Sequence, residues 1–172
     1  ALDFLNIEQI ERIEVVRGSR AALYGADAIG GVIQIFTRRG EEQGLHARVR
    51  AAAGSKNNWE RSLGLSGGNG ATRFNLSASL DELNRFDRTT VGDPHSADKD
   101  VYRNKSLALA LSHSFSERFQ VGLNALDQHG KSAFDTVSEF WPSVPYFDFT
   151  TRSASAFAAG DINEQWHSRL EL

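Results

Sequence analysis

The chain has 172 residues, of which 40% are hydrophobic and 24% charged, and its formal net charge is −3 at pH 7. This balance offers no basic excess for a nucleic-acid partner, and the absence of cysteine excludes disulfides and thiolate chemistry. No run of about 18 apolar residues occurs, so the sequence predicts no transmembrane helix. This observation does not exclude a transmembrane β-barrel, because the strands of such a barrel alternate apolar and polar residues.

The first forty residues differ from the rest of the chain. They contain two β-rich runs, at residues 10–16 and 32–37. Between them, Ser19 is a suitable N-cap for a short helix over residues 20–24. The sequence therefore predicts a strand, a short helix and a second strand in residues 1–40.

From residue 45 to residue 172, apolar and polar residues alternate in successive segments. A period of two is typical of antiparallel strands with one apolar and one polar face. We predict roughly seven strands here, each of about 9–11 residues, the length that suits a tilted membrane crossing. The charged, glycine-flanked residues 41–44 are expected to link the two parts.

The connections between these strands alternate in length. Tight turns are expected at residues 67–71, 116–118 and 160–164, and long connections near residues 84–104 and 127–149. Short turns on one side and longer loops on the other are typical of outer-membrane barrels. The predicted fold is therefore all-β and mainly antiparallel, a part of a large transmembrane β-barrel. A secreted β-sandwich used for binding or adhesion is the alternative, because its strands alternate in the same way.

A sheet of seven strands cannot close round a lumen, and lipid tolerates no unpaired strand edge. We therefore expect the chain to be a piece of a longer protein, with further strands after residue 172.

The run from Arg17 to Thr37, together with residues 10–16, resembles the end of the plug domain of TonB-dependent outer-membrane transporters. The resemblance implies that residues 1–40 are the C-terminal part of a small α+β plug domain and that residues 45–172 begin the barrel around it. It also implies a location in the bacterial outer membrane, in contact with its lipid. The positions that carry the plug motif are Arg17, Gly18, Tyr24, Gly25, Gly30 and Gly31.

The glycines of this motif are expected to shape the backbone, since they permit positive φ, and to contact no transported ligand. Arg17 has two interpretations. It is either a solvated strand end or a plug arginine paired with a barrel carboxylate.

The resemblance implies uptake of a scarce nutrient, with energy delivered by TonB through a segment that lies outside this sequence. No chemistry is performed on the nutrient, so the chain is not expected to be an enzyme. Within the family the likeness is greatest to the receptors for cobalamin. Ferric siderophores or haem are the alternative cargo, since the plug motif is shared by their receptors.

Asp98 and Asp100 have the spacing that points both carboxylates to one side of an extended segment. Calcium prefers such oxygen ligands on flexible loops. The resemblance to cobalamin receptors implies a calcium site formed by Asp87, Asp98, Asp100 and Asp135 in two extracellular loops. Phe134 stands where those receptors have a tyrosine, which removes one oxygen contact. Aspartate also caps turns locally, which is the simpler interpretation of these residues.

Other patterns are less specific. The five histidines show no spacing typical of zinc ligands. Trp59, Trp141 and Trp166 suit an aromatic girdle at the membrane interface or ordinary packing equally well.

Overall fold

The computed structural model describes residues 7–18, 25, 28, 30–40, 43–86, 100–133, 146–163 and 165–172. It contains a two-stranded and a seven-stranded antiparallel sheet, which confirms the predicted all-β, antiparallel fold. No helix among these residues is both long and apolar enough to span a membrane.

The small sheet is a hairpin of β1 (Ile10–Val16) and β2 (Val32–Thr37), preceded by a 3₁₀ turn, η2 (Ile7–Gln9). Both predicted strands are confirmed at their predicted bounds. The predicted helix over residues 20–24 lies outside the described residues. Gly31 has a φ of 130°, and a Cβ atom there would lie 2.8 Å from the carbonyl oxygen of Val16, so only glycine fits this position.

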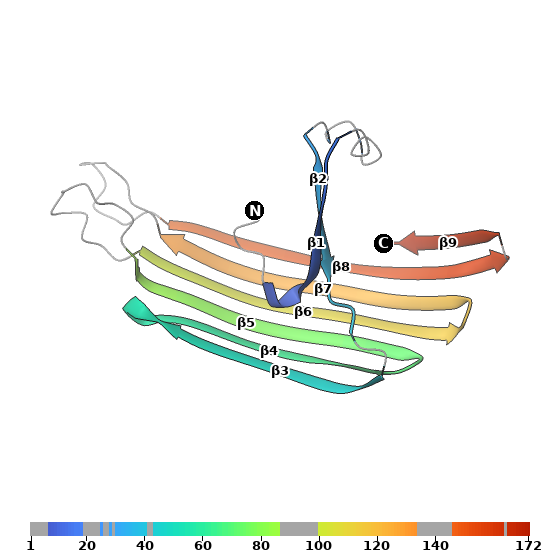
Figure 1. Cartoon of the computed structure of the whole chain (residues 1–172), viewed down its shortest axis with the longest axis horizontal. Coiled ribbons are helices and arrows are strands. Elements are labelled where there is room, and N and C mark those ends of the chain that lie inside the picture. The colour runs from blue at the N-terminus through green and yellow to red at the C-terminus, as the bar shows by residue number, and fades with distance from the viewer. Residues whose placement is uncertain are drawn as a thin grey trace.

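The large sheet is a meander in which each strand pairs with its neighbours in the sequence (Figure 1). Its strands are β3 (Gln43–Gly54), β4 (Asn58–Asn69), β5 (Thr72–Phe86), β6 (Asp100–Ser116), β7 (Phe119–Ala133), β8 (Tyr146–Asn163) and β9 (Trp166–Glu171). A 3₁₀ turn, η4 (Ser55–Asn57), connects β3 and β4.

The strands from β3 to β8 have 12 to 18 residues, so the predicted length of 9–11 residues was too short. The predicted turn at residues 160–164 was also misplaced, because β8 continues to Asn163. Backbone pairing explains this extension, since the amide of Asp161 donates to the carbonyl oxygen of Arg118 at 2.9 Å. Residues with a polar pattern therefore extend the strands beyond the apolar segments from which their lengths were predicted.

β8 is the longest strand although its middle is built mostly of small residues. Its larger side chains fit against glycines of β7. The ring of Phe157 covers Gly122, and the ring of Phe149 covers Gly130 so closely that a Cβ atom would collide with it. Each glycine thus leaves the space that the aromatic ring of the next strand fills.

The connections lie at two opposite ends of the sheet. Residues 70–71, 117–118 and 164–165 connect strands at one end, which we call the turn end. Residues 55–57, 87–99 and 134–145 connect strands at the other, which we call the loop end. The alternation of short and long connections agrees with the sequence prediction.

The two faces of the large sheet differ in polarity. On the outer face, Leu63, Leu107 and Leu123 are 55%, 51% and 40% exposed. The opposite, inner face carries the hairpin and buries polar side chains, among them Asn75, Asn104 and Gln128. Within the described part of the chain the only buried hydrophobic residues are Ala28 and Ala159. No second sheet packs on the apolar face there, which favours the barrel over the sandwich.

An arginine in the middle of the outer face should destabilise the protein in lipid. Leu109 of β6 is such a position, since it pairs in register with Leu76 and Ala125. We expect Leu109→Arg to lower the free energy of unfolding by about 2–4 kcal/mol, because it places a charge near the bilayer midplane. The measurement is urea-induced unfolding of the protein in lipid vesicles.

Val101→Arg is the matched control, because Val101 lies on the same face of β6 near the loop end. A charge near the interface costs only about 0–1 kcal/mol. Equal losses for the two variants would contradict the assignment of this face to lipid.

Candidate functional site

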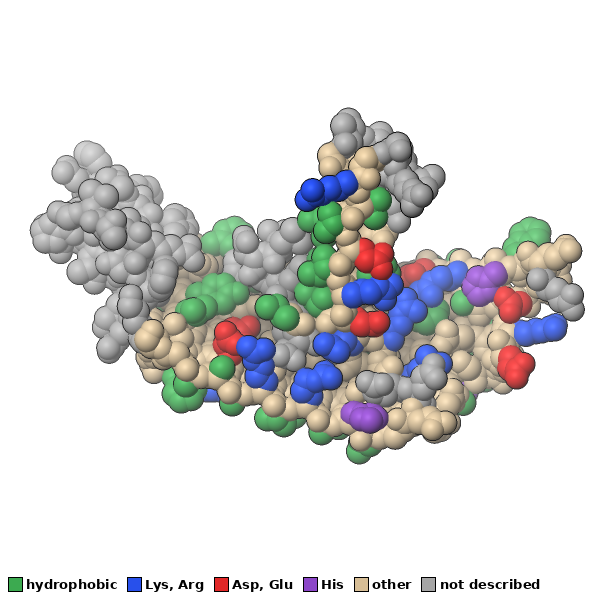
Figure 2. All heavy atoms as spheres, in the orientation of Figure 1, with side chains coloured by type: hydrophobic (Ala, Val, Ile, Leu, Met, Phe, Trp, Pro, Cys, Tyr) green, Lys and Arg blue, Asp and Glu red, His purple; other side chains and the backbone are tan. Residues whose placement is uncertain are grey.

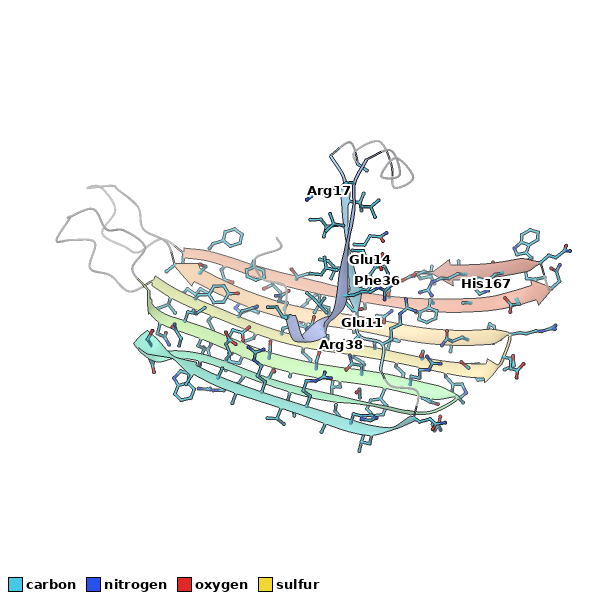
Figure 3. The ribbon with its side chains drawn as sticks, viewed as in Figure 1. Glu11, Glu14, Arg17, Phe36, Arg38 and His167 are labelled. Carbon is cyan, nitrogen blue, oxygen red and sulfur yellow. The ribbon has the colours of Figure 1, made fainter. Side chains whose placement is uncertain are left out.

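The hairpin of β1 and β2 stands upright on the inner face of the large sheet (Figures 1 and 3). In Figure 3, the label Arg38 marks the base of the hairpin and the label Arg17 marks its far end. The contact with the sheet is therefore made by the residues at the base, just before β1 and just after β2.

Three hydrogen bonds hold this base. The Gln9 side-chain amide donates to Ser106 Oγ on β6. The side-chain amide of Asn75 on β5 donates to the carbonyl oxygen of Arg38 at 2.9 Å. The amide of Arg38 in turn donates to the carbonyl oxygen of Gln9 at 2.9 Å, which ties the two ends of the hairpin together.

Polar side chains are buried on the inner face under the hairpin, and we call this group the polar bed. Its members are Asn75, Ser77, Ser79, Asn104, Ser106 and Gln128. Gln128 donates to Asn104 at 3.3 Å within this bed. Ser77 Oγ is the one buried side-chain atom of the described residues that has no hydrogen-bond partner. A buried hydroxyl without a partner is costly, so this position suits an ordered water.

The chain leaves the hairpin through Gly40, which crosses close to the backbone of β5. Gly40 has a φ of 98°, and a Cβ atom there would collide with the carbonyl oxygen of Phe74. Glycine is therefore required where the chain passes from the hairpin to the sheet.

A cavity of about 530 Å³ lies on the inner face toward the turn end. It lies between Thr37 and Arg39, at the end of the hairpin, and strands β5 to β9. Its ionisable lining residues are Arg39, Arg73, Glu117, Arg118, Asp161, His167, Arg169 and Glu171. Figure 2 shows Lys and Arg side chains gathered around the base of the hairpin on this face. Such a lining favours water and polar solutes over apolar ligands.

The charges of the hairpin are largely satisfied within it. The guanidinium of Arg12 lies 3.7 Å from the ring centre of Phe36 and donates to Glu14 at 2.7 Å. The hydrogen bond to Glu14 is the main cause that raises the pKa of Arg12 above its ordinary value, and Glu11 acts in the same direction. The hairpin is therefore attached to the sheet by neutral hydrogen bonds rather than through these charges.

The described residues of the plug motif lie away from this base. Arg17 is exposed at the far end of the hairpin and forms no ion pair with any described residue (Figure 3). Gly18 and Gly25 have positive φ angles of 81° and 111°, and Gly30 is exposed. Tyr24 lies outside the described residues. The motif therefore shapes the end of the hairpin, whereas other residues contact the sheet.

The predicted calcium ligands are not brought together within the described part of the chain. Asp87, Asp98 and Asp135 lie outside it, and Asp100 is described only as the first residue of β6. The described residues contain no group of three or more side chains suited to a metal ion. The calcium site stays a prediction.

Sequence reasoning missed the anchoring residues Gln9, Asn75 and Ser106. The alternation predicts that Asn75 lies on the polar strand face, toward the plug or the lumen water, and it predicts nothing for Ser106. The alternation identifies that face, but the hydrogen bonds join residues 37 and 97 positions apart. Only the folded sheet brings such residues together.

Comparison with known proteins agrees with this arrangement. Residues 1–32 match the family model of the TonB-dependent receptor plug domain. The predicted resemblance to TonB-dependent receptors is confirmed. Proteins with this plug domain are outer-membrane transporters and not enzymes, so the match agrees with the predicted location in the bacterial outer membrane and with the prediction that the chain is not an enzyme.

Two curated relatives extend the match beyond the plug. The chain is 29% identical over its full length to the Vitamin B12 transporter BtuB of Vibrio cholerae serotype O1, and covers 28% of that protein. Over 73% of its length it is 31% identical to the Vitamin B12 transporter BtuB of Photobacterium profundum, and covers 20% of it. The chain thus spans less than a third of the length of these relatives.

Removal of one anchoring amide should loosen the hairpin. We expect Asn75→Ala to cost about 1 kcal/mol, because it leaves the carbonyl of Arg38 without its donor. Amide hydrogen exchange in β2 should become about fivefold faster.

Asn124→Ala is the matched control, because Asn124 also lies on the inner face but donates to Ser155 of the neighbouring strand at 3.4 Å. Exchange in β2 that is equally fast in both variants would show that Asn75 does not hold the hairpin.

Proposed function

We propose that the protein takes up a scarce nutrient across the bacterial outer membrane with energy supplied by TonB. The observation that carries this proposal is a plug-type hairpin attached by hydrogen bonds to the polar face of a sheet whose opposite face is apolar. The match of residues 1–32 to the plug family supports it independently.

In this mechanism the plug closes the lumen until it rearranges. Gln9 and Arg38 hold the hairpin at the inner face, and a rearrangement must break or exchange their hydrogen bonds. The polar bed and the charged cavity supply water and side-chain partners for groups exposed in that step. TonB would supply the energy for this rearrangement.

We propose cobalamin as the cargo, because both relatives described above are vitamin B12 transporters. Ferric siderophores or haem are the alternative within the same family. We further propose that Asp87, Asp98, Asp100 and Asp135 bind calcium and order the extracellular loops before the cargo docks. Four carboxylates from two loops suit calcium, which takes oxygen ligands in flexible geometry.

Cobalamin binding to outer-membrane vesicles that carry the intact receptor tests the cargo. We expect saturable binding that weakens about tenfold when a chelator removes calcium, a typical coupling between two linked sites. Vesicles without the receptor are the control. If a receptor that is shown to be folded binds no cobalamin, the proposal that cobalamin is the cargo is refuted. Iron chelates would then be tested as the cargo.

The aspartates are tested by the double variant Asp98→Asn and Asp100→Asn. We expect it to bind cobalamin about tenfold more weakly and to lose its response to the chelator, since the ligands of calcium are gone. Asp161→Asn is the matched control, because it removes a carboxylate at the turn end, where Asp161 contacts His167 at 2.7 Å. A double variant that still responds to the chelator would contradict the calcium site.

A further inference from the structure

The charged side chains of the outer face lie between the middle of the large sheet and its loop end. The register of β4 to β8 places nine ionisable residues on this face from the row of Leu107 to the loop end, and we call them the loop-end belt. They are Arg61, Glu82, Arg103, Lys105, Asp127, His129, Lys131, Asp148 and Arg152.

The turn end of the same face is different. Its described strand positions include Phe74, Phe115 and Phe119, and no Lys, Arg, Asp or Glu occurs there on β4 to β9. The rings of Phe115 and Phe119 stack with centres 5.9 Å apart. A general need for polar residues at a membrane boundary would place charges at both ends, so the belt requires a separate explanation.

Each acidic residue of the loop-end belt lies within ion-pair distance of a basic residue or a histidine. Glu82 is shared between Arg103 at 3.2 Å and Arg61 at 3.7 Å. Asp127 pairs with Arg152 at 2.8 Å. Asp148 lies 3.7 Å from His129.

Positive charge remains after these contacts. The belt has five Lys or Arg against three Asp or Glu, which leaves a net charge of +2 with His129 neutral. Lys105 is exposed and forms no ion pair with any described residue. Lys131 also lacks one in the described part of the chain, and its ammonium lies 3.8 Å from the ring centre of Tyr146.

Aromatic residues mark the same level of the sheet. Trp59 and Tyr146 lie on the outer face at the loop end and are 40% and 56% exposed. The guanidinium of Arg61 lies 5.2 Å from the Trp59 ring. Tyr and Trp are enriched where hydrocarbon meets headgroups, so the basic residues beside them lie at headgroup level.

We propose that the loop-end belt binds phosphate-bearing headgroups of lipids in the outer leaflet, with Lys105 and Lys131 as the principal contacts. This site rests on the proposed orientation of the protein in the outer membrane and is separate from the cargo site. Both lysines project from the face that lipid covers, and their long stems allow the ammonium groups to reach the headgroup layer. A phosphate accepts several charge-assisted hydrogen bonds, which arginines and lysines supply.

The register places the two lysines close together. Arg103 lies opposite Lys131, and Lys105 lies opposite His129 on the same pair of strands. Opposite and diagonal neighbours in antiparallel strands are within about 5–8 Å, a separation that one lipid with two phosphates can bridge.

The test is binding of bisphosphorylated lipid A to the intact receptor in detergent, followed by native mass spectrometry. We expect Lys105→Gln and Lys131→Gln each to weaken binding about fivefold and the double variant to weaken it about 25-fold. Arg48→Gln is the matched control, since it removes one positive charge from β3 on the inner face. Its binding should equal that of the unaltered receptor.

Two further ligands identify what is recognised. Dephosphorylated lipid A should bind about as weakly to the unaltered receptor as bisphosphorylated lipid A does to the double variant. Inorganic phosphate at equal concentration should not compete, because it lacks the acyl chains that lie along the apolar band. Competition by inorganic phosphate would replace the lipid site with a simple anion site and overturn the proposal.

Equal lipid binding by the double variant and the Arg48→Gln variant would also overturn the proposal. Folding is checked by the heat-dependent shift in electrophoretic mobility, which requires neither lipid binding nor transport. Cobalamin binding is measured in parallel. A receptor that binds lipid but no cobalamin refutes the proposed cargo alone, and one that binds cobalamin with no effect of the lysines refutes the belt alone.

Discussion

Pairing of the backbone is the constraint on which the rest of this structure depends. Hydrocarbon offers no water to peptide groups, so each N–H and C=O must find its partner in a neighbouring strand. The ladder between β6 and β7 meets this requirement almost without interruption from Tyr102–Ser132 to Ser114–Gln120. Because the side chains of paired strands alternate strictly, the same ladder separates apolar residues onto one face and polar residues onto the other.

This separation reverses the usual relation between burial and polarity. Leucines are exposed on the outer face, while asparagines and serines are buried under the hairpin. The apolar residues are stabilised when lipid covers them. The polar residues are stabilised by hydrogen bonds to one another and to the hairpin, as Gln128 and Asn104 illustrate. Stability in such a protein is therefore shared between the membrane and a network of polar contacts.

Much of the fold followed from the sequence, because alternation is a local property. The strands of the large sheet were predicted from the alternation of apolar and polar residues over residues 45–172, and those of the hairpin from the β-rich runs at residues 10–16 and 32–37. Strand lengths were underestimated, since polar residues near the loop end pair their backbones as well as apolar ones do. The hydrogen bond from Gln9 to Ser106 could not be predicted from local sequence patterns, because it depends on how the whole sheet positions residues that are distant in the chain. The aspartate loops stay predictions based on resemblance.

The position of the three hydrogen bonds at the base of the hairpin has a mechanical consequence. Gln9 lies just before β1 and Arg38 just after β2. Both ends of the hairpin are therefore attached to the large sheet at the same level. A tension applied along the chain that precedes Ile7 would reach Gln9 first and Arg38 only afterwards. Hydrogen bonds that are loaded one after another break at low force, whereas hydrogen bonds that are loaded together resist as a group. The hairpin is thus attached firmly against random motion and weakly against a directed pull from its N-terminal side.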